Sequence, residues 1–566
     1  MKKKLLDAAI VLAAAALLLV GAIGGIDVSW GPLAIRLHAW SRPFFLLAAL
    51  LAARFWIAPF NLEYVATRGL AALLLAVVSM YATYQVRVCG GLDSYGYVSA
   101  SSLLASGHLI QPQPLVKYLP FERASDAAAP LGYIAGRDGQ TELPRFPLGL
   151  PAVMAVFRIF GPSGPFFVPL VMGVFTIALA FLIARDLPPA PTSSVALLAA
   201  ALVAIDPLQF DYAIQPMSDV PAACWLLAAV WLMLRGGSEG GSKRTGPTYD
   251  REYVGRVLLD PAIAGLCAGM AFFTRPALMP AALAIAIVTL DRPWKETARY
   301  LAATAVFVVL QMAINATLYG SIVASGYGPA SVMFKISPAR LAENVSNYGK
   351  WLTHSHSFLI WPIWPVSFAV LRRQRWAWQL SAIAAAAAAP YLFYLVFDDW
   401  ESGRFLLPAV LLVLILGARA LGALLNDRAV TGAVVLAAGL AAAAASNRFM
   451  QNEGVYRFGD VEAKYLLAGR WVDAHIPSNA VVFAALHSGS LRYYGHRQTI
   501  RWDQIPSDRM SITLHNLTAA GYAPYLALDS TADEPMLFNE RFAGDPAVRI
   551  EPIDRVRVVN FYRFVP

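Results

Sequence analysis

Charged residues are scarce in this chain. Only 14% of its 566 residues are Asp, Glu, Lys or Arg, whereas 58% are hydrophobic and the mean hydropathy is +0.54. A soluble globular domain carries about 25% charged residues, so a purely water-soluble protein is excluded. Cysteine is rare as well: Cys224 and Cys267 lie in apolar runs, and Cys89 is the third. These three residues suggest neither a disulfide framework nor a zinc site.

Two further observations bear on other classes of protein. We find no internal repeat, although many transporters are built from such repeats. The net charge of +9 does not point to nucleic acid, because Lys and Arg collect in the segments between apolar runs, as in cytoplasmic loops of membrane proteins. The composition therefore predicts a multi-pass protein of the lipid bilayer without a nucleic-acid partner.

Apolar runs near the length that crosses a bilayer recur through most of the chain. They predict an all-α polytopic membrane bundle of about thirteen transmembrane helices. The first run is longer than the apolar core of a signal peptide, so we interpret it as a retained span. The predicted spans are 5–26, 43–59, 66–86, 164–185, 193–206, 219–235, 261–273, 277–290, 299–318, 355–371, 376–396, 405–424 and 429–446.

The distribution of basic residues predicts the topology. With a cytoplasmic N-terminus, the inner segments hold basic clusters such as Lys2–Lys4, Lys243–Arg244 and Arg372–Arg373, whereas the short outer loop DPLQFDYAIQPMS holds no Lys or Arg. An odd number of spans then places the C-terminus outside. This topology leaves two long outer segments, 87–163 and the tail from residue 447.

The tail differs in pattern from the rest of the chain. Short β-rich runs (AVVFAAL, YLALD, VRVVNFYRF) alternate with helical patterns (VEAKYLLAGRWVDAHI, DRMSITLHNLTAAG). We therefore predict a small extracytoplasmic (periplasmic) α/β domain over 447–566. The transmembrane domain is predicted over 1–446 and includes the outer loop 87–163.

A lone acid stands just after the third predicted span. In CGGLDSYGYVSASSLLASGHL, Asp93 begins a stretch whose helical spacing puts Tyr97 on the same face. A helix at the membrane surface would turn its first residue, Asp93, toward the mouth of the bundle. Capping of this helix is an alternative role for the carboxylate.

Two arginines occur where apolar runs are interrupted. Arg275 precedes a proline in AFFTRPALMP, and Arg404 opens a span in DDWESGRFLLPAV. An arginine at membrane depth is costly and is usually paired or functional. Two guanidinium groups on one face of a bundle suit a phosphate, since each can bind it through two hydrogen bonds. For Arg404, snorkelling to the interface is the alternative.

Other polar residues flank the predicted spans. Arg145, in ELPRFPLGLPAV, is a candidate contact for an anion. Asp219, in QPMSDVPAACWLL, is a candidate pocket residue or a helix cap. His354 and His356 lie two apart in WLTHSHSF, and with Glu142 as a third group they are candidates for a divalent metal site.

The order of five motifs resembles the GT-C glycosyltransferases. LDSYGYVSASSLLASGHL, LPRFPLGLPAVMAVF, PMSDVPAACWLLAAVWLMLR, AGLCAGMAFFTRPALMPAALA and GRFLLPAV follow one another within residues 80–425. The chain is similar to bacterial relatives of protein O-mannosyltransferases and of the aminoarabinose transferase that modifies lipid A. The resemblance implies a GT-C fold and transfer of a sugar from a polyprenyl-phosphate donor to a protein, lipid or glycan acceptor outside the cell membrane. It implies no nucleotide cofactor, and it implies a location in the inner (plasma) membrane of a bacterial cell.

The resemblance also implies roles for individual residues. Family members use an aspartate in the first large outer loop for catalysis, and Asp93 is the matching position. Many members have a second acid directly after it, whereas this chain has Ser94, so metal use is left open. The implied enzyme is an inverting hexosyl or pentosyl transferase with Asp93 as general base and Arg404 and Arg275 on the donor phosphate. Tyr97, Arg145 and Asp219 are then expected to line the substrate pocket.

Two other functions stay open from the sequence. A lipid-linked sugar transporter or flippase would place its site at the midplane between two gates. An oligosaccharide ligase would keep its key arginines and histidine in a late outer loop, for which 319–354 is the candidate, with Lys335, Arg340, Lys350 and His354. An outward-facing cavity with Asp93 and an arginine on its wall would favour the transferase.

Overall fold

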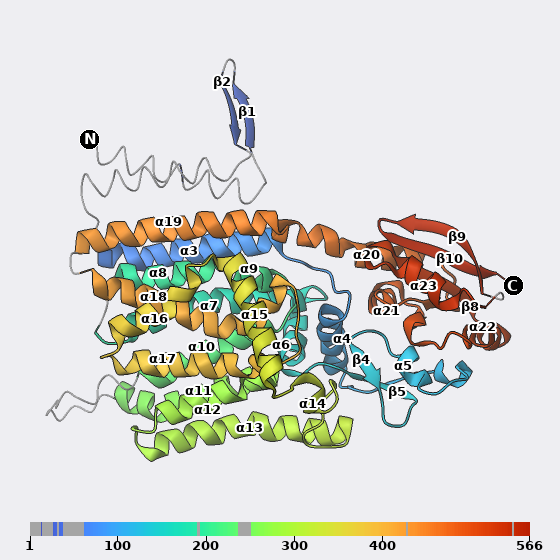
Figure 1. The fold of residues 1–566 in the computed structure, drawn as a ribbon, viewed down its shortest axis with the longest axis horizontal. Coiled ribbons are helices and arrows are strands. Elements are labelled where there is room, and N and C mark those ends of the chain that lie inside the picture. Colours follow the sequence, from blue (N-terminus) through green and yellow to red (C-terminus); the bar gives the residue numbers. More distant parts are fainter. Residues whose placement is uncertain are drawn as a thin grey trace.

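Most of the chain folds into helices that run side by side in one bundle, with a small sheet at one end (Figure 1). The computed structural model describes Ala13 and residues 26–30, 33–37, 62–189, 193–235, 251–425, 428–545 and 548–565. Near the N-terminus, β1 (Ile26–Trp30) and β2 (Leu33–Leu37) are paired antiparallel strands. The predicted combination of a mostly helical bundle and a small C-terminal α/β unit is confirmed.

The helices at the centre of the bundle are apolar on every side, as expected of segments buried among other helices. α7 and α18 are examples, and both are largely buried. In Figure 1, α3 and α19 lie along one side of the bundle and α13 lies along the opposite side. The bundle helices are α3 (Leu62–Tyr84), α7 (Phe167–Asp186), α8 (Ser193–Ala204), α9 (Pro207–Ile214), α10 (Asp219–Arg235), α11 (Arg251–Thr274), α12 (Met279–Val288), α13 (Trp294–Tyr319), α15 (Pro338–His356), α16 (Ile360–Leu371), α17 (Arg375–Ala388), α18 (Leu407–Leu424) and α19 (Arg428–Asn452).

The predicted spans fall on helices wherever the structure describes them. The first two, 5–26 and 43–59, lie outside the described residues. By length and composition, three described helical stretches can cross a membrane, or four if the bent pair α8 and α9 forms one span. The three are Gly164–Asp186, Trp294–Tyr319 and Trp400–Leu424. The count of thirteen spans and the orientation of the termini therefore stay predictions.

The segment between α3 and α7 caps one end of the bundle. Its first helix, α4, carries a serine-rich face that Arg158 binds, donating to the Val98 carbonyl at 3.1 Å and to Ser101 Oγ at 3.2 Å. A three-stranded antiparallel sheet of order β3-β5-β4 follows. The elements are α4 (Asp93–Ala105), β3 (Gln111–Pro112), α5 (Ala124–Ala128), β4 (Tyr133–Ala135), β5 (Thr141–Pro144) and α6 (Gly149–Phe157).

The C-terminal unit is a five-stranded sheet of order β7-β6-β8-β10-β9 with four helices. β7, β6 and β8 are parallel, whereas β10 is antiparallel to β8 and β9. The predicted boundary at residue 447 falls inside α19, which continues to Asn452. The elements are α20 (Phe458–His475), β6 (Ala480–Phe483), α21 (Ser488–Gly495), β7 (Gln498–Ile500), α22 (Met510–Ala519), β8 (Ala523–Asp529), α23 (Glu534–Phe542), β9 (Arg549–Val556) and β10 (Val559–Val565).

The C-terminal unit packs against the segment that follows α3, at the same end of the bundle (Figure 1). The two parts share a hydrophobic core in which Leu115 and Leu119 join Val481 and Phe483. The backbone N–H of Arg501 also donates to the Ala127 carbonyl at 2.7 Å. The two segments predicted as extracytoplasmic therefore form one continuous structure over the bundle.

Candidate active site

A cavity of about 490 Å³ lies where the bundle, α4 and α20 meet. Its wall contains every residue that the sequence suggested as a base, a phosphate ligand or a pocket residue, although these residues are spread over more than 300 positions. The set is Asp93, Tyr97, Arg145, Asp219, Arg275 and Arg404.

Asp93 is the first residue of α4, and its carboxylate is half-buried in the cavity wall. The N-cap residue is Leu92, which makes no side-chain cap, so the structure does not show the capping role for Asp93. Instead, Arg404 Nη2 donates to Asp93 Oδ2 at 3.1 Å. A carboxylate in the first turn is also favoured by the positive end of the helix.

The glycine pair before α4 makes a tight turn possible. Gly91 has φ +59°, a conformation that glycine adopts without strain. Ser94 Oγ accepts from the Gly90 N–H at 3.0 Å and donates to the Gly90 carbonyl at 2.8 Å, which closes the turn. A Cβ on Gly90 would lie 2.1 Å from the ring of Tyr465 in α20. Ser94, at the position of the second acid of many relatives, therefore shapes the turn that presents Asp93.

Arg404 is presented by a short 3₁₀ helix, Trp400–Leu406, just before α18. Asp399 caps this helix by accepting from the Ser402 N–H at 2.6 Å. The guanidinium carbon lies 5.5 Å from the centre of the Tyr212 ring and 5.1 Å from that of Phe405. Two aromatic faces and the Asp93 carboxylate thus fix the side chain in the cavity wall.

Arg275 follows the last residue of α11. Pro276 disfavours a helical conformation in the residue before it, and Arg275 is extended, with φ −141° and ψ 99°. Its guanidinium forms an ion pair with the buried Asp219 and lies 5.1 Å from the Phe405 ring centre. Arg275 and Arg404 therefore approach the same aromatic ring, each with an acidic partner.

Arg145 differs from these two arginines in its partners. It lies between β5 and α6, and its guanidinium carbon is 6.0 Å from the centre of the Tyr327 ring. Within the described residues it has no ion pair, and its buried Nε atom, like that of Arg404, has no hydrogen-bond partner. Arg145 therefore contributes a positive charge to the cavity that no described carboxylate neutralises.

A second cavity of about 240 Å³ adjoins the first and extends toward α13. Both cavities are lined by Tyr97, Arg145 and Arg275, so these residues lie at the junction. Asp93 and Arg404 line only the first cavity. The site thus has an arginine-rich junction and a separate side that carries Asp93.

Sequence reasoning missed the contribution of α20 to the cavity, which comes from Phe458, Glu462 and Tyr465. The helical pattern of α20 was recognised, but only the Gly90–Gly91 pair signalled that another element approaches the turn closely. Burial raises the pKa of Glu462 to about 7, and the ammonium of Lys464 lowers it by less than burial raises it.

The raised pKa of Glu462 predicts a pH-dependent effect of Glu462→Gln on stability. The unfolded chain releases this proton near the ordinary value of 4.5, whereas the folded protein releases it near 7. Wild-type stability therefore falls as the pH rises through this window, and glutamine removes the loss. We expect thermal unfolding in detergent to show a larger gain in midpoint for Glu462→Gln at pH 8 than at pH 5. Equal gains at both pH values would contradict the burial of this carboxyl.

The structure does not bring the metal candidates together. Glu142 is 1% exposed and lies in the contact with the C-terminal unit. His354 Nε2 is 2.8 Å from Glu453, and His356 Nε2 is 2.7 Å from Asp206. Among the described residues there is no group of three or more His, Cys, Asp or Glu side chains that could hold a metal ion.

Comparison with solved structures identifies the fold. ArnT from Cupriavidus metallidurans in the apo state matches with a TM-score of 0.57 and 14% identity, over 90% of this chain and 98% of ArnT. ArnT bound to undecaprenyl phosphate matches with a TM-score of 0.55 and 13% identity, over 87% of this chain and 97% of ArnT.

An oligosaccharyltransferase is also similar. AglB from Archaeoglobus fulgidus, in complex with an inhibitory peptide and a dolichol-phosphate, matches with a TM-score of 0.50 and 13% identity, over 88% of this chain and 74% of AglB. No family model matches the sequence, and no curated protein matches it either. The chain therefore shares the fold of ArnT and AglB, and the aminoarabinose-transferase-like fold implied by the sequence resemblance is confirmed.

Proposed function

We propose that this protein is a membrane glycosyltransferase that moves a sugar from a polyprenyl-phosphate donor to an acceptor at the extracytoplasmic face. The observation that carries the proposal is the single cavity in which Asp93 and three arginines meet. The GT-C fold supports it, since ArnT has been solved with undecaprenyl phosphate and AglB with dolichol-phosphate.

Arg145 is the first candidate to bind the donor phosphate. Arg404 and Arg275 are each paired with a carboxylate, whereas Arg145 has no such partner among the described residues. An anion at the arginine-rich junction would satisfy Arg145 and place its charge near Arg275. Because the phosphate gains negative charge as the sugar leaves, fixed cations there stabilise the transition state more than the ground state.

Asp93 is the proposed general base. It would take the proton of the acceptor hydroxyl as the hydroxyl oxygen attacks the anomeric carbon, while the bond from that carbon to the phosphate oxygen breaks. The lipid phosphate keeps the electron pair, so no separate acid is required. Attack opposite the leaving phosphate inverts the anomeric centre. The hydrogen bond from Arg404 orients the carboxylate for this step.

The geometry favours a transferase over the oligosaccharide ligase considered from the sequence. The segment 319–354 contributes Tyr327 and Met333 to the cavity wall. The candidate residues of this segment, Lys335, Arg340, Lys350 and His354, line neither of the two cavities at this site. The cations that face the cavity come instead from the three arginines of the GT-C motifs.

Replacing Arg145 by alanine is expected to raise the KM for the donor about 10- to 100-fold, because a charge-assisted contact to phosphate contributes about 1.5–3 kcal/mol. Arg145→Lys keeps the positive charge and should raise the donor KM less than Arg145→Ala does. Steady-state kinetics with a labelled donor measure the effect. Arg123→Ala, an exposed arginine of the same outer segment, is the control and should leave the KM unchanged. An unchanged donor KM in Arg145→Ala would exclude a phosphate contact at this residue.

The proposed function is tested by a transfer assay with purified protein in detergent. Polyprenyl phosphates carrying different labelled hexoses and pentoses are supplied with a membrane and cell-wall extract as acceptor. We expect one donor to release free polyprenyl phosphate together with a labelled acceptor. Absence of release from every donor would contradict the proposal.

A further inference from the structure

One carboxylate in the cavity has no role in the mechanism above. Asp93 is paired with Arg404 and Asp219 with Arg275, whereas Glu462 has neither an ion pair nor a hydrogen bond within the described residues. Burial disfavours the ionised form of this carboxylate, and hydroxyl groups of a ligand can supply hydrogen bonds that the protein does not. Such a group is available for a ligand.

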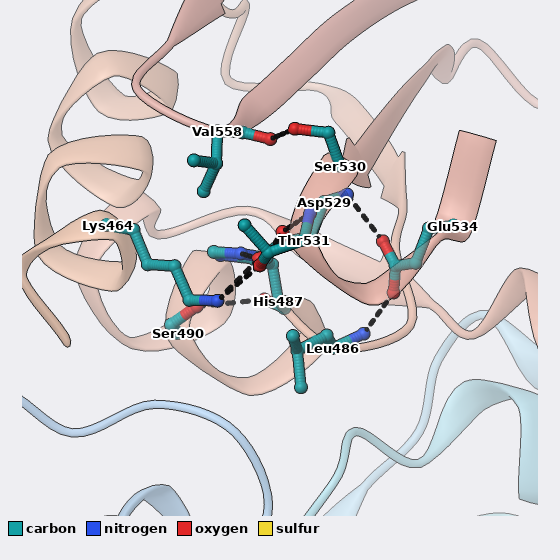
Figure 2. Close-up of polar contacts among 9 residues, drawn as sticks. All are labelled: Lys464, Leu486, His487, Ser490, Asp529, Ser530, Thr531, Glu534 and Val558. Carbon is teal, nitrogen blue, oxygen red and sulfur yellow. Dashed lines mark hydrogen bonds and ion pairs between the residues drawn. The ribbon is translucent and has the colours of Figure 1, made fainter. Parts of the chain in front are cut away.

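The C-terminal unit holds the helix that carries Glu462 in a fixed position. Figure 2 shows Lys464, two residues further along α20, reaching the buried Asp529 at the end of β8. Lys464 Nζ lies 2.8 Å from Asp529 Oδ2 and 3.2 Å from Thr531 Oγ1. His487 Nε2 lies 3.0 Å from the same Asp529 oxygen. An ionised carboxylate can only accept, so His487 is the donor of this hydrogen bond.

This network is built around one charge. Burial disfavours ionised Asp529, yet hydrogen bonds from His487, Lys464 and Thr531 hold its pKa well below the usual value. The His487 ring also packs on the Tyr465 ring at 4.6 Å, and Tyr465 covers the Gly90–Gly91 turn. The network therefore fixes α20 against the turn that presents Asp93, which preorganises Glu462 in the cavity wall.

The two sides of the site differ in chemistry. The junction with the second cavity has Arg145 and Arg275, which suit an anion. The side formed with α20 has the carboxylate Glu462 and the aromatic rings of Phe458 and Tyr465. The acidic group on this side disfavours a second phosphate there.

We infer that Glu462 is part of the acceptor subsite, and that this subsite takes an uncharged sugar residue of a glycan. The partly exposed ring of Phe458 can pack on the apolar face of a sugar, and a carboxylate can accept from two neighbouring hydroxyl groups. The sugar hydroxyl that reacts would then point to Asp93, which lines the same cavity. This inference rests on the proposed function, whose donor would occupy the arginine-rich side.

Binding to the protein in lipid nanodiscs tests the inference without turnover. The probes are hexyl β-glucoside, hexyl β-galactoside, hexyl α-mannoside, and hexyl β-glucoside 6-phosphate. We expect at least one neutral glycoside to bind, and Glu462→Gln to weaken it about ten-fold, the size of one charge-assisted hydrogen bond. The 6-phosphate should bind the wild type more weakly than the neutral glucoside, and Glu462→Gln should reduce that difference. Asp460 is an exposed acid of the same helix, and Asp460→Asn is the control. It should change neither the affinity for the neutral glycoside nor the difference between the two glucosides.

Three results would overturn the inference: no binding of any neutral glycoside, equal binding to wild type and Glu462→Gln, or tighter binding of the phosphorylated probe. Undecaprenyl phosphate, titrated into the same nanodiscs, reports separately on the donor side. It should bind wild type and Glu462→Gln equally. Its failure to bind wild type would contradict the proposed donor, while the glycoside results would still decide the role of Glu462.

Discussion

Replacing Asp93 by asparagine is expected to lower the rate of sugar transfer about 10²–10⁴-fold, the usual contribution of a positioned general base. Asparagine has nearly the same shape but cannot take the acceptor proton. Its carbonyl oxygen still accepts from Arg404, so we expect the variant to fold. Initial rates at saturating labelled donor measure the effect, and thermal unfolding and gel filtration in detergent check the fold.

Asp126→Asn is the matched control for Asp93. Asp126 lies in the same outer segment, where it pairs with the exposed Arg123 at 2.7 Å. The same chemical change at this position should leave transfer at the wild-type rate. Wild-type activity in Asp93→Asn would remove the base assignment, and equal losses in both variants would indicate a general effect on folding.

Replacing Glu142 by glutamine is expected to have the largest effect on stability. Glu142 is 1% exposed, and both of its carboxylate oxygens accept from Arg492 Nη1 at 2.8 Å. Gln113 donates to the same carboxylate at 2.8 Å. The change leaves the Arg492 charge buried without its partner, which costs about 3–5 kcal/mol. We expect a lower unfolding midpoint, faster proteolysis between α19 and β6, and loss of transfer as α20 leaves the cavity.

The double variant Glu142→Gln with Arg492→Met distinguishes charge from shape. It removes both members of the ion pair, so it should recover part of the stability lost in Glu142→Gln. Glu540→Gln, at an exposed position of α23, should leave the midpoint unchanged. A wild-type midpoint in Glu142→Gln would show that this ion pair does not hold the C-terminal unit in place.

Local pattern was enough to predict the bundle helices and much of the C-terminal unit. Long apolar runs mark α7 and α18 because a buried helix is apolar on every side. Alternation of β-rich and helical runs marked α20, α22 and β8 in the same way. The run VRVVNFYRF was less informative: it is the end of β9, a turn and β10. Arg557 adopts φ +54° in that turn, and neither turn residue, Arg557 or Val558, is a glycine or asparagine that would signal it.

The membership of the site could be predicted in part, but its pairings could not. Asp93 and Arg404 were each identified from polar residues next to apolar runs, yet the sequence does not show that they touch across 311 positions. The sequence suggests Glu142 only as a third candidate for a metal site, and its partner in the structure, Arg492, lies 350 positions away in another part of the fold. The same long-range docking brings Glu462 into the cavity. Such contacts depend on how whole elements pack, which no local pattern encodes.

The account depends on a lipid phosphate entering the cavity that Asp93 and the arginines line. An experimental structure of the protein with bound undecaprenyl phosphate tests this most directly. We expect the phosphate within hydrogen-bond distance of Arg145 and on the same cavity wall as Arg404 and Asp93, with the isoprenoid tail leaving toward the lipid. A phosphate bound outside this cavity, with the cavity left empty, would contradict the account.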